Sequence, residues 1–285
     1  MTKINTKVLM SGAEYFSDDD AINAHMDSSI SVNVDTAVAE HRAIEQTFRD
    51  AGIEVIKVPT PEGMQDAVYT ANWALIRGNK AVMSNLPNTR QPEEAYAEEQ
   101  LSKLGYEIVK LPEEYIFSGQ GDAVPCGNHL FTGSTYRTDT HIHPLLAREL
   151  GFEVIGLQTI PYTDNDGNPL TNPVTGLPDS FFYDIDLAVA IIDDHTIAWC
   201  PEAFVPESQE RIHALEDIDK IEVSLEEAMH GFACNLVSTG EHVIMSDRAP
   251  QLKAALEARG LTVHTPHVTE LAKGGGFIRC TSLTL

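Results

Sequence analysis

The sequence predicts a single α/β domain, residues 1–285, in which five similar units form a closed ring. A helical pattern, a short β-branched strand and a hairpin of apolar strands recur about every 50 residues, as in repeat architectures. Gly52, Gly105, Gly151 and Gly260 end four of the helical patterns and are separated by 53, 46 and 109 residues. A doubly wound sheet also alternates helices and strands, but paired strands after every helix–strand segment favour the ring.

Each unit begins with an amphipathic helix that leads into a strand. Apolar residues three and four positions apart predict the helices, and alternating apolar residues predict the strands. The five helix–strand segments are 34–59, 92–112, 143–158, 206–224 and 249–266. The fourth segment lacks the glycine that ends the other helices.

An apolar hairpin completes each unit. The expected hairpins are 66–84, 121–134, 181–200, 231–246 and 274–285. Turn-forming residues such as Gly-Asn and Asp-Asp lie at the centres of the first four. The fifth has no returning strand, so the strand at residues 6–13 is expected to complete it and close the ring. Residues 161–180, rich in Pro, Gly, Asn and Asp, interrupt the third unit, and we interpret them as a flap over a substrate site.

The composition limits the partners of the protein. The chain has 43 Asp and Glu against 19 Lys and Arg, a formal charge of −24. Such an acidic surface disfavours nucleic acid and anionic membranes, and it is compatible with a cationic small molecule or with solubility alone. No apolar run approaches the ~18 residues of a transmembrane helix. The first residues lack a signal-peptide pattern and the four cysteines are scattered, so we expect a cytoplasmic protein with reduced thiols.

Polar residues inside the apolar hairpins are the first candidates for a functional site. In a ring the hairpins line the axis, so their polar side chains should converge on a central cavity. These residues are Asp66, Asn72, Asp122, Asp184, Asp186, Asn235 and Cys280. Each alone is compatible with a hydrogen-bonded core group, but one in every hairpin favours a shared site.

The segment 273–282, in which three glycines precede an Arg-Cys-Thr-Ser sequence, resembles the nucleophile motif of the guanidino-group modifying enzymes. That superfamily includes dimethylarginine dimethylaminohydrolases, arginine deiminases and amidinotransferases, and the chain is most similar to the first branch. Further matches, in the order of the family, are 65–72, 90–94, 119–123 and 133–138. The resemblance covers essentially the whole chain and implies a five-bladed α/β propeller, the pentein fold.

The resemblance implies that a Cys280 thiolate attacks the guanidinium carbon of arginine or an N-substituted arginine. Ammonia or an amine leaves, and water hydrolyses the S-alkylthiouronium intermediate to a ureido product. Carboxylates suit this substrate because they pair bidentately with guanidinium, and a nearby cation lowers the pKa of a thiol. No metal or other cofactor is implied.

The resemblance also assigns substrate contacts. Asp66 would hold the guanidinium with Asp186 as a second ligand, while Arg90 and Arg137 would take the substrate carboxylate. Asn72 stands where several relatives have aspartate, so one contact would be weaker. The expected substrate-binding residues are Asp66, Asn72, Arg90, Asp122, Arg137 and Asp186.

Two positions depart from the family pattern. Asp184 stands where the family has its catalytic histidine, and Ser118 stands where the family has the glutamate partner of that histidine. The two changes fit each other, because serine can donate a hydrogen bond to a carboxylate that glutamate would repel. We therefore expect Asp184, with Ser118, to act as general acid and base, which requires burial to raise its pKa.

Alternatives to hydrolysis stay open at this point. The same residues are compatible with amidino transfer from an arginine-like donor to an amine, and with binding of an arginine derivative without turnover. His141 and His143 have a spacing found in metal sites, but no third ligand accompanies them, so no metal is expected. His129 is the nearest histidine that could replace the missing one. A homo-oligomer is compatible with the sequence.

Overall fold

The computed structural model describes residues 3–87 and 89–285, which form an α/β fold with five three-stranded sheets. The strands are β1 (Lys7–Met10), β2 (Glu54–Lys57), β3 (Ala74–Arg77), β4 (Lys80–Met83), β5 (Glu107–Val109), β6 (Ala123–Cys126), β7 (His129–Gly133), β8 (Glu153–Leu157), β9 (Val189–Asp193), β10 (Thr196–Trp199), β11 (Asp219–Glu222), β12 (Val237–Ser238), β13 (His242–Ile244), β14 (Thr262–His264) and β15 (Leu283–Thr284). The helices are α1 (Val34–Asp50), α2 (Pro92–Lys103), α3 (His143–Leu150), α4 (Pro206–His213), α5 (Leu225–Gly231) and α6 (Pro250–Ala258).

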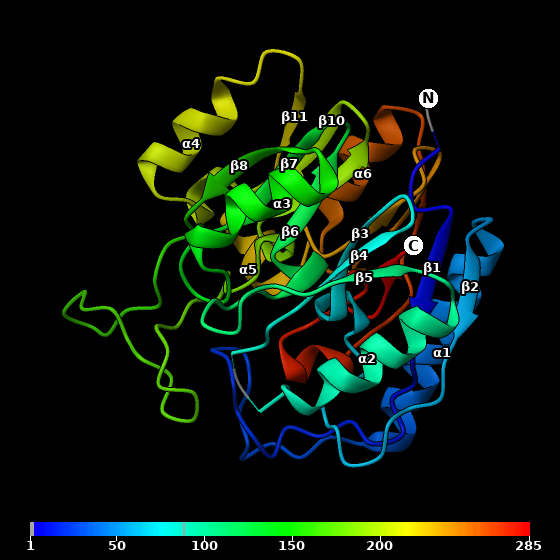
Figure 1. Ribbon diagram of the computed structural model, residues 1–285. Coiled ribbons are helices and arrows are strands. Elements are labelled where there is room, and N and C mark those ends of the chain that lie inside the picture. Colours follow the sequence, from blue (N-terminus) through cyan, green and yellow to red (C-terminus); the bar gives the residue numbers. More distant parts are fainter. Residues whose placement is uncertain (1–2, 88) are drawn as a thin grey trace.

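All five sheets share one topology. The first strand of each hairpin (β3, β6, β9, β12 and β15, here called the inner strands) pairs antiparallel with a middle strand. The middle strand pairs parallel with the strand that follows a helix. The inner strand β9 also contacts the inner strands β6 and β12 of other sheets. Figure 1 shows α1, α2, α4 and α6 at the periphery of the molecule. The expected α/β class is confirmed, and the five matching sheets are consistent with the expected ring.

The sheet that joins the two ends of the chain has the predicted composition. β1 pairs antiparallel with β15, with Leu9 opposite Leu283, and parallel with β2. Leu9 and Leu283 are fully buried and belong to one apolar cluster with Trp73. The prediction that the strand at residues 6–13 completes the fifth hairpin is therefore confirmed.

The helix α1 fixes the approach to the candidate nucleophile. Its buried face carries Ile44 and Phe48, and burying a side chain as large as Phe48 contributes about 1.5–3 kcal/mol. On the same face, the Glu40 carboxylate accepts hydrogen bonds of 2.7–3.0 Å from the backbone N–H groups of residues 269–271. These residues lead directly into the glycine run before Cys280, so Glu40 ties that run to the first helix.

The predicted hairpins are wrong in one respect, because their first residues do not form strands. They form short 3-10 turns instead: η1 (Thr70–Trp73), η2 (Gly119–Gly121) and η4 (Ile185–Leu187). Buried polar residues explain the difference, since a turn lets their side chains and backbone hydrogen-bond locally where a ladder would not. The candidate residues therefore lie at the entrance to the inner strands and not within them.

The structure differs from the sequence prediction in one further segment and agrees with it in another. The helix α5 was not predicted, although Ser224 caps it by accepting from the Glu227 N–H, a Ser-x-x-Glu signal readable in the sequence. Residues 161–180 form the expected long loop, which protrudes from the body of the molecule (Figure 1) and contains only isolated bridges such as Thr163 with Pro169.

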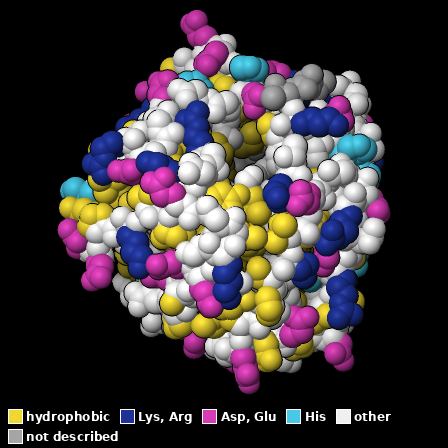
Figure 2. All heavy atoms as spheres, turned by 45° about the vertical axis from the view of Figure 1, so that its right-hand side comes forward, with side chains coloured by type: hydrophobic (Ala, Val, Ile, Leu, Met, Phe, Trp, Pro, Cys, Tyr) yellow, Lys and Arg dark blue, Asp and Glu magenta, His cyan; other side chains and the backbone are white. Residues whose placement is uncertain are grey.

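The surface carries charges of both signs. Figure 2 shows acidic and basic side chains dispersed over one face, with no continuous basic patch, and a hollow in which apolar atoms are visible. Among the described residues, no helix is both long and apolar enough to cross a bilayer.

Candidate active site

The candidate residues gather where the 3-10 turns meet the inner strands. The turn η2 contacts both η1 and η4, so residues from three units become neighbours. Cys280 precedes β15 and lies against the same turns, because the Ala71 N–H donates to the Cys280 carbonyl at 3.1 Å. The sequence therefore identified residues that the fold does bring together.

Cys280 is 3% exposed and is held by two polar side chains. Asn235 Nδ2 donates to Cys280 Sγ at 3.1 Å, and Asn235 Oδ1 accepts from the Cys280 N–H at 3.2 Å. The thiol donates to Asp186 Oδ2 at 3.4 Å. Gly276 is required beside it, since a Cβ there would lie 2.5 Å from the Tyr69 ring and 3.0 Å from Cys280 Cβ.

The Cys280 thiol is protonated in the ligand-free protein. Burial, followed by the Asp186 carboxylate, raises its pKa well above the usual range. A guanidinium cation bound beside the sulfur would oppose both effects and favour the thiolate. The geometry therefore suits a nucleophile that ionises when a cationic substrate arrives.

Asp184 and Ser118 are neighbours that both contact the side-chain amide of Asn72, and the expected hydrogen bond from Ser118 to Asp184 stays a prediction. Asn72 Nδ2 donates to Asp184 Oδ2 at 2.7 Å and to Ser118 Oγ at 2.9 Å. Burial raises the pKa of Asp184, which is the direction that a general acid at neutral pH needs. Gly121 permits this contact, because a Cβ there would lie 2.2 Å from Asn72 Nδ2 and 2.7 Å from Asp184 Oδ2.

Three buried carboxylates form the floor of the site. Asp122, Asp184 and Asp186 are each 1–2% exposed, and each has one carboxylate oxygen without a hydrogen-bond partner among the described residues. Burial raises the pKa of all three, and the charge of Asp184 further raises the pKa of Asp122 and Asp186. Such a cluster favours a cation and would release protons when it binds one.

Arg90 connects this cluster to a carboxylate of its own. Its Nε and Nη2 donate to both oxygens of Glu93 at 2.8 Å, and Nη1 donates to Asn72 Oδ1 at 2.7 Å. Nη2 also donates to the Tyr69 carbonyl at 3.0 Å. Arg90 thus orients the Asn72 amide so that its nitrogen faces Asp184, and its expected contact with a substrate carboxylate stays a prediction.

Asp66 lines an open cavity of about 350 Å³ together with Arg90, Glu93 and two exposed acids, Asp19 and Asp20. Burial raises the pKa of Asp66 to about 6, and the Arg90 charge lowers it. Cys280 does not line this cavity. The structure therefore places the predicted guanidinium ligand and the nucleophile in adjoining but separate spaces.

Arg137, the second predicted ligand of the substrate carboxylate, lies near the glycine run that precedes Cys280. Its guanidinium stacks on the Tyr183 ring at 4.0 Å and donates to the Ile22 carbonyl at 3.0 Å. The Tyr183 hydroxyl donates to the Gly275 carbonyl at 2.8 Å, and Asn23 donates to the carbonyl of the preceding glycine at 3.0 Å. Residues 22 and 23 therefore lie over the glycine run and over the predicted carboxylate ligand.

The histidines noted in the sequence lie elsewhere. His141 contacts Asp139 at 2.7 Å, His143 contacts the Gly133 carbonyl at 3.0 Å, and His129 contacts Asp217 at 2.8 Å. His129 is therefore not a replacement for the missing catalytic histidine. Within residues 3–87 and 89–285, no cluster of three or more metal-ligating side chains has metal-site geometry.

Three residues of the site escaped the sequence analysis. Glu93 appeared only as part of a motif, and its partner role with Arg90 requires the fold. Tyr183 and His25 lie outside the polar pattern of the hairpins. His25 contacts the Phe181 carbonyl at 2.8 Å, and burial lowers its pKa to about 4, so it is neutral.

Replacing Asn235 with alanine is expected to slow alkylation of Cys280 by a small amidine electrophile several-fold at neutral pH. The variant loses a donor to the sulfur and so stabilises the thiolate less. The rate of alkylation should be measured by mass spectrometry across pH, where the midpoint should move upward. Asn235→Asp, which keeps the size but adds a repelling charge, should be slower still. An unchanged midpoint in both variants would show that Asn235 does not support the thiolate.

Known proteins resemble this chain along its whole length. Residues 9–285 match the family described as N,N dimethylarginine dimethylhydrolase, eukaryotic. An N(G),N(G)-dimethylarginine dimethylaminohydrolase of Mycobacterium tuberculosis is 33% identical over 93% of this chain and 81% of its own length. The bifunctional arginine dihydrolase/ornithine cyclodeaminase AgrE of Nostoc is 30% identical, and the match spans 97% of this chain but 37% of AgrE.

Solved structures agree with the family match. The product-bound N-terminal domain of ArgZ, a cyanobacterial arginine dihydrolase, superimposes with a TM-score of 0.87 at 27% identity and covers 98% of this chain and 97% of that domain. A dimethylarginine dimethylaminohydrolase of Pseudomonas aeruginosa has the same fold, with a TM-score of 0.78 at 16% identity over the full length of both chains. The chain is thus a cysteine-dependent guanidino hydrolase and belongs to the N,N-dimethylarginine dimethylhydrolase family.

Proposed function

We propose that this protein hydrolyses the guanidino group of arginine or an N-substituted arginine through a covalent adduct on Cys280, in a single domain with five-bladed propeller architecture. The observation that carries the proposal is the buried thiol, which contacts Asp186 and Asn235 beside three carboxylates with unpaired oxygens. The family match supports this assignment.

The proposed first step forms a carbon–sulfur bond. Asp66 and Asp186 hold the substrate guanidinium, and its positive charge favours release of the Cys280 thiol proton to solvent, which leaves the thiolate. The thiolate attacks the guanidinium carbon, and Asp184 gives a proton to the departing nitrogen as the carbon–nitrogen bond breaks. The leaving group is ammonia or an amine.

The second step regenerates the thiol. Water attacks the carbon of the S-alkylthiouronium intermediate, and Asp184, now ionised, accepts a proton from that water. The carbon–sulfur bond then breaks, and the products are a ureido compound and free Cys280. Asn72 keeps Asp184 and Ser118 together, because its amide nitrogen donates to both side chains.

Substrate entry requires motion of the covering segment. The thiol is 3% exposed, and residues 22 and 23 bond to Arg137 and to the glycine run. We propose that this segment, with the flap at 161–180, opens to admit substrate. Asn172 of the flap already donates to the Ala21 carbonyl at 3.2 Å, so the two segments would move together. Arg137 would then turn toward the substrate carboxylate.

The substrate is tested by incubating the protein with arginine and with methylated arginines, because the relatives include both a dimethylarginine hydrolase and arginine dihydrolases. Intact-protein mass spectrometry reports the adduct, and chromatography reports ureido product, amine and ammonia. An adduct on Cys280 with ureido product supports hydrolysis. Product that forms only after addition of an amine would indicate amidino transfer, and tight binding without an adduct would indicate a binding protein.

Substrate affinity is expected to fall as the pH drops below about 6. Asp66 must be ionised to hold a guanidinium, and its pKa of about 6 means that it takes up a proton there. Below that value affinity should weaken by about tenfold per pH unit if Asp66 alone titrates. Calorimetry of ligand binding to a Cys280→Ala variant between pH 4.5 and 8 measures this. Asp66→Asn should bind weakly and without that pH dependence, whereas a pH dependence that persists in Asp66→Asn would assign the proton to another group.

A further inference from the structure

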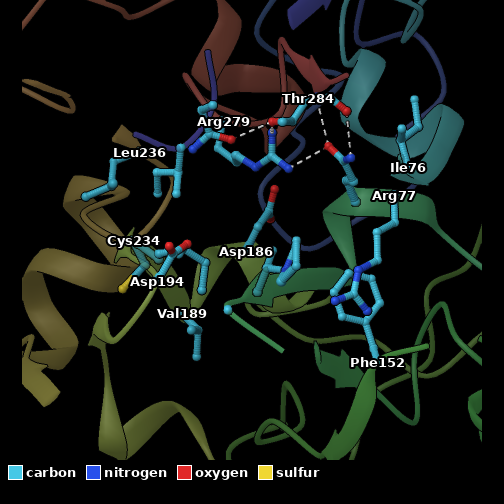
Figure 3. A pocket seen from close by; sticks show the side chains of 18 of the residues that line it. Ile76, Arg77, Phe152, Asp186, Val189, Asp194, Cys234, Leu236, Arg279 and Thr284 are labelled. Carbon is cyan, nitrogen blue, oxygen red and sulfur yellow. Dashed lines mark hydrogen bonds between the residues drawn. The ribbon is translucent and has the colours of Figure 1, made fainter. Parts of the chain in front are cut away.

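A second cavity of about 320 Å³, whose lining Figure 3 shows, lies at the opposite end of the inner strands and includes Asp186, the carboxylate that contacts Cys280. Its mouth is lined by the hairpin turns, including Gly78, Gly127 and Asp194. Its walls are mostly apolar and include Val189, Ala190, Ile191 and Leu236, together with Cys234. We refer to it below as the turn-side cavity.

The floor of the turn-side cavity is polar and incompletely satisfied. Asp186 is 1% exposed and points toward the guanidinium of Arg279 (Figure 3), and its Oδ1 has no partner within the described part of the chain. Arg279 donates to Gln120 Oε1 at 2.8 Å and to the Ser282 carbonyl at 2.9 Å.

The carboxylate of Asp186 lies between this cavity and the sulfur of Cys280. Its Oδ2 accepts from the Cys280 thiol at 3.4 Å, and the same residue lines the cavity. The cavity that contains Asp66 and Arg90 lies where the inner strands begin, and the turn-side cavity lies where they end. Among the inner strands, β3, β6 and β9 have four or five residues and span roughly 13–17 Å, so the two openings are well separated.

We propose that the turn-side cavity is the route by which a small neutral nucleophile, water in the ordinary reaction, reaches the Cys280 adduct. This inference rests on the proposed function, because that reaction needs a second reactant while the first still fills its own pocket. A covalently held substrate blocks the side from which it entered. The turn-side cavity is open to solvent at its mouth and ends at the residue that touches the sulfur.

The charges of the turn-side cavity separate this route from substrate entry. Arg279 lies at its floor, and Arg77 lies at its mouth with its guanidinium over the Phe152 ring at 3.9 Å. Asp186 at the floor and Asp194 at the mouth offset these two cations, so the turn-side cavity gives a guanidinium no net attraction, unlike the cavity of Asp66, where four acids face Arg90. Its apolar walls also penalise any charged group, whereas neutral water and small neutral amines meet no such penalty. Water that arrives by this route adds its oxygen to the adduct carbon and gives a proton to Asp184, as in the proposed function. The carbon–sulfur bond then breaks.

Accessibility of the cavity can be measured without any turnover. Cys234 lines it, whereas the neighbouring buried Cys200 does not. Methyl methanethiosulfonate, a small neutral thiol reagent, should label Cys234 faster than Cys200 at alkaline pH, as read by peptide mass spectrometry. The variant Ile191→Trp, which enlarges a side chain of the cavity wall, should suppress labelling of Cys234. The control His195→Trp places the same side chain on an exposed turn nearby and should change nothing.

Turnover then tests the route itself. Ile191→Trp should lower kcat at least tenfold and accumulate the Cys280 adduct, while His195→Trp behaves as wild type. Hydroxylamine should capture the wild-type adduct as an N-hydroxyguanidine, and Ile191→Trp should suppress that product too. Ala190→Leu fills the cavity from within and is a second test should the tryptophan variant not fold.

The outcomes distinguish this inference from the proposed function. Equal labelling of Cys234 and Cys200 in the wild type would show a closed cavity and overturn the route. Suppressed labelling with unchanged kcat in Ile191→Trp would also overturn it, while leaving hydrolysis intact. A wild-type protein that never forms an adduct would refute the proposed function and the route with it.

Discussion

Replacement of Cys280 by alanine is expected to abolish turnover, with a loss of at least about a thousandfold, because no other group can form the covalent intermediate. Binding of arginine-like ligands should persist, since Asp66 and the carboxylates at 184 and 186 remain. Product formation and calorimetric affinity are to be measured on the same sample. The variant should also take up no amidine electrophile at the active site.

The matched control is Cys200→Ala, which removes another fully buried thiol that lines neither of the two cavities. Both variants should fold, as each change removes only one sulfur atom from the core. Near-wild-type activity in Cys280→Ala would eliminate the covalent mechanism. Loss of activity in Cys200→Ala alone would show that packing, and not chemistry, controls the rate.

Asp184→Asn should lower kcat by about 10²–10⁴-fold, the usual contribution of a general acid and base. Asparagine keeps the shape of the side chain but can neither supply nor accept the proton. In the wild type, burial raises the pKa of Asp184, so activity should fall on the alkaline side once the acid form needed for the first step is lost. That alkaline limb should disappear in the variant.

Glu227→Gln is the control for Asp184→Asn, because Glu227 is also buried but accepts from the Gln251 and Leu252 N–H groups and lines neither of the two cavities. It should retain most activity and the wild-type pH profile. Equal kcat and pH profiles in Asp184→Asn and wild type would remove Asp184 from the acid–base role.

A double variant tests the coordinated change at these two positions. Ser118→Glu combined with Asp184→His should recreate the pair found in relatives and retain measurable activity. Ser118→Glu alone should be nearly inactive, because it adds a second carboxylate beside Asp184. Full activity of the Ser118→Glu variant would contradict the interpretation that serine is needed at position 118 because a glutamate there would repel Asp184.

The sequence predicts the architecture well because its signals are local. The helix at 34–50 has its apolar period and an Asn33 cap, and the strands that follow alternate as expected. The glycine run before Cys280 also marks this cysteine as the predicted nucleophile. Each of these features depends on residues close together in the chain, which a linear reading can capture.

The sequence could not provide contacts between units. Asn235 and Asp186 lie 45 and 94 residues from Cys280, yet both touch its sulfur. Arg90 was expected to face the substrate, but Glu93 engages it from one helical turn away. Side-chain pairing in a buried polar cluster depends on distances of tenths of an ångström, which composition and spacing do not encode.

The pairing of β1 with β15 has a consequence for how the protein becomes active. Cys280 lies just before β15, so its surroundings depend on contacts between residues 7–10 and 283–284, which are far apart in the sequence. Such high contact order slows folding. A chain that has not yet formed this pairing lacks the surroundings of Cys280, so catalytic competence should appear abruptly when β1 and β15 pair, and not build up gradually during folding.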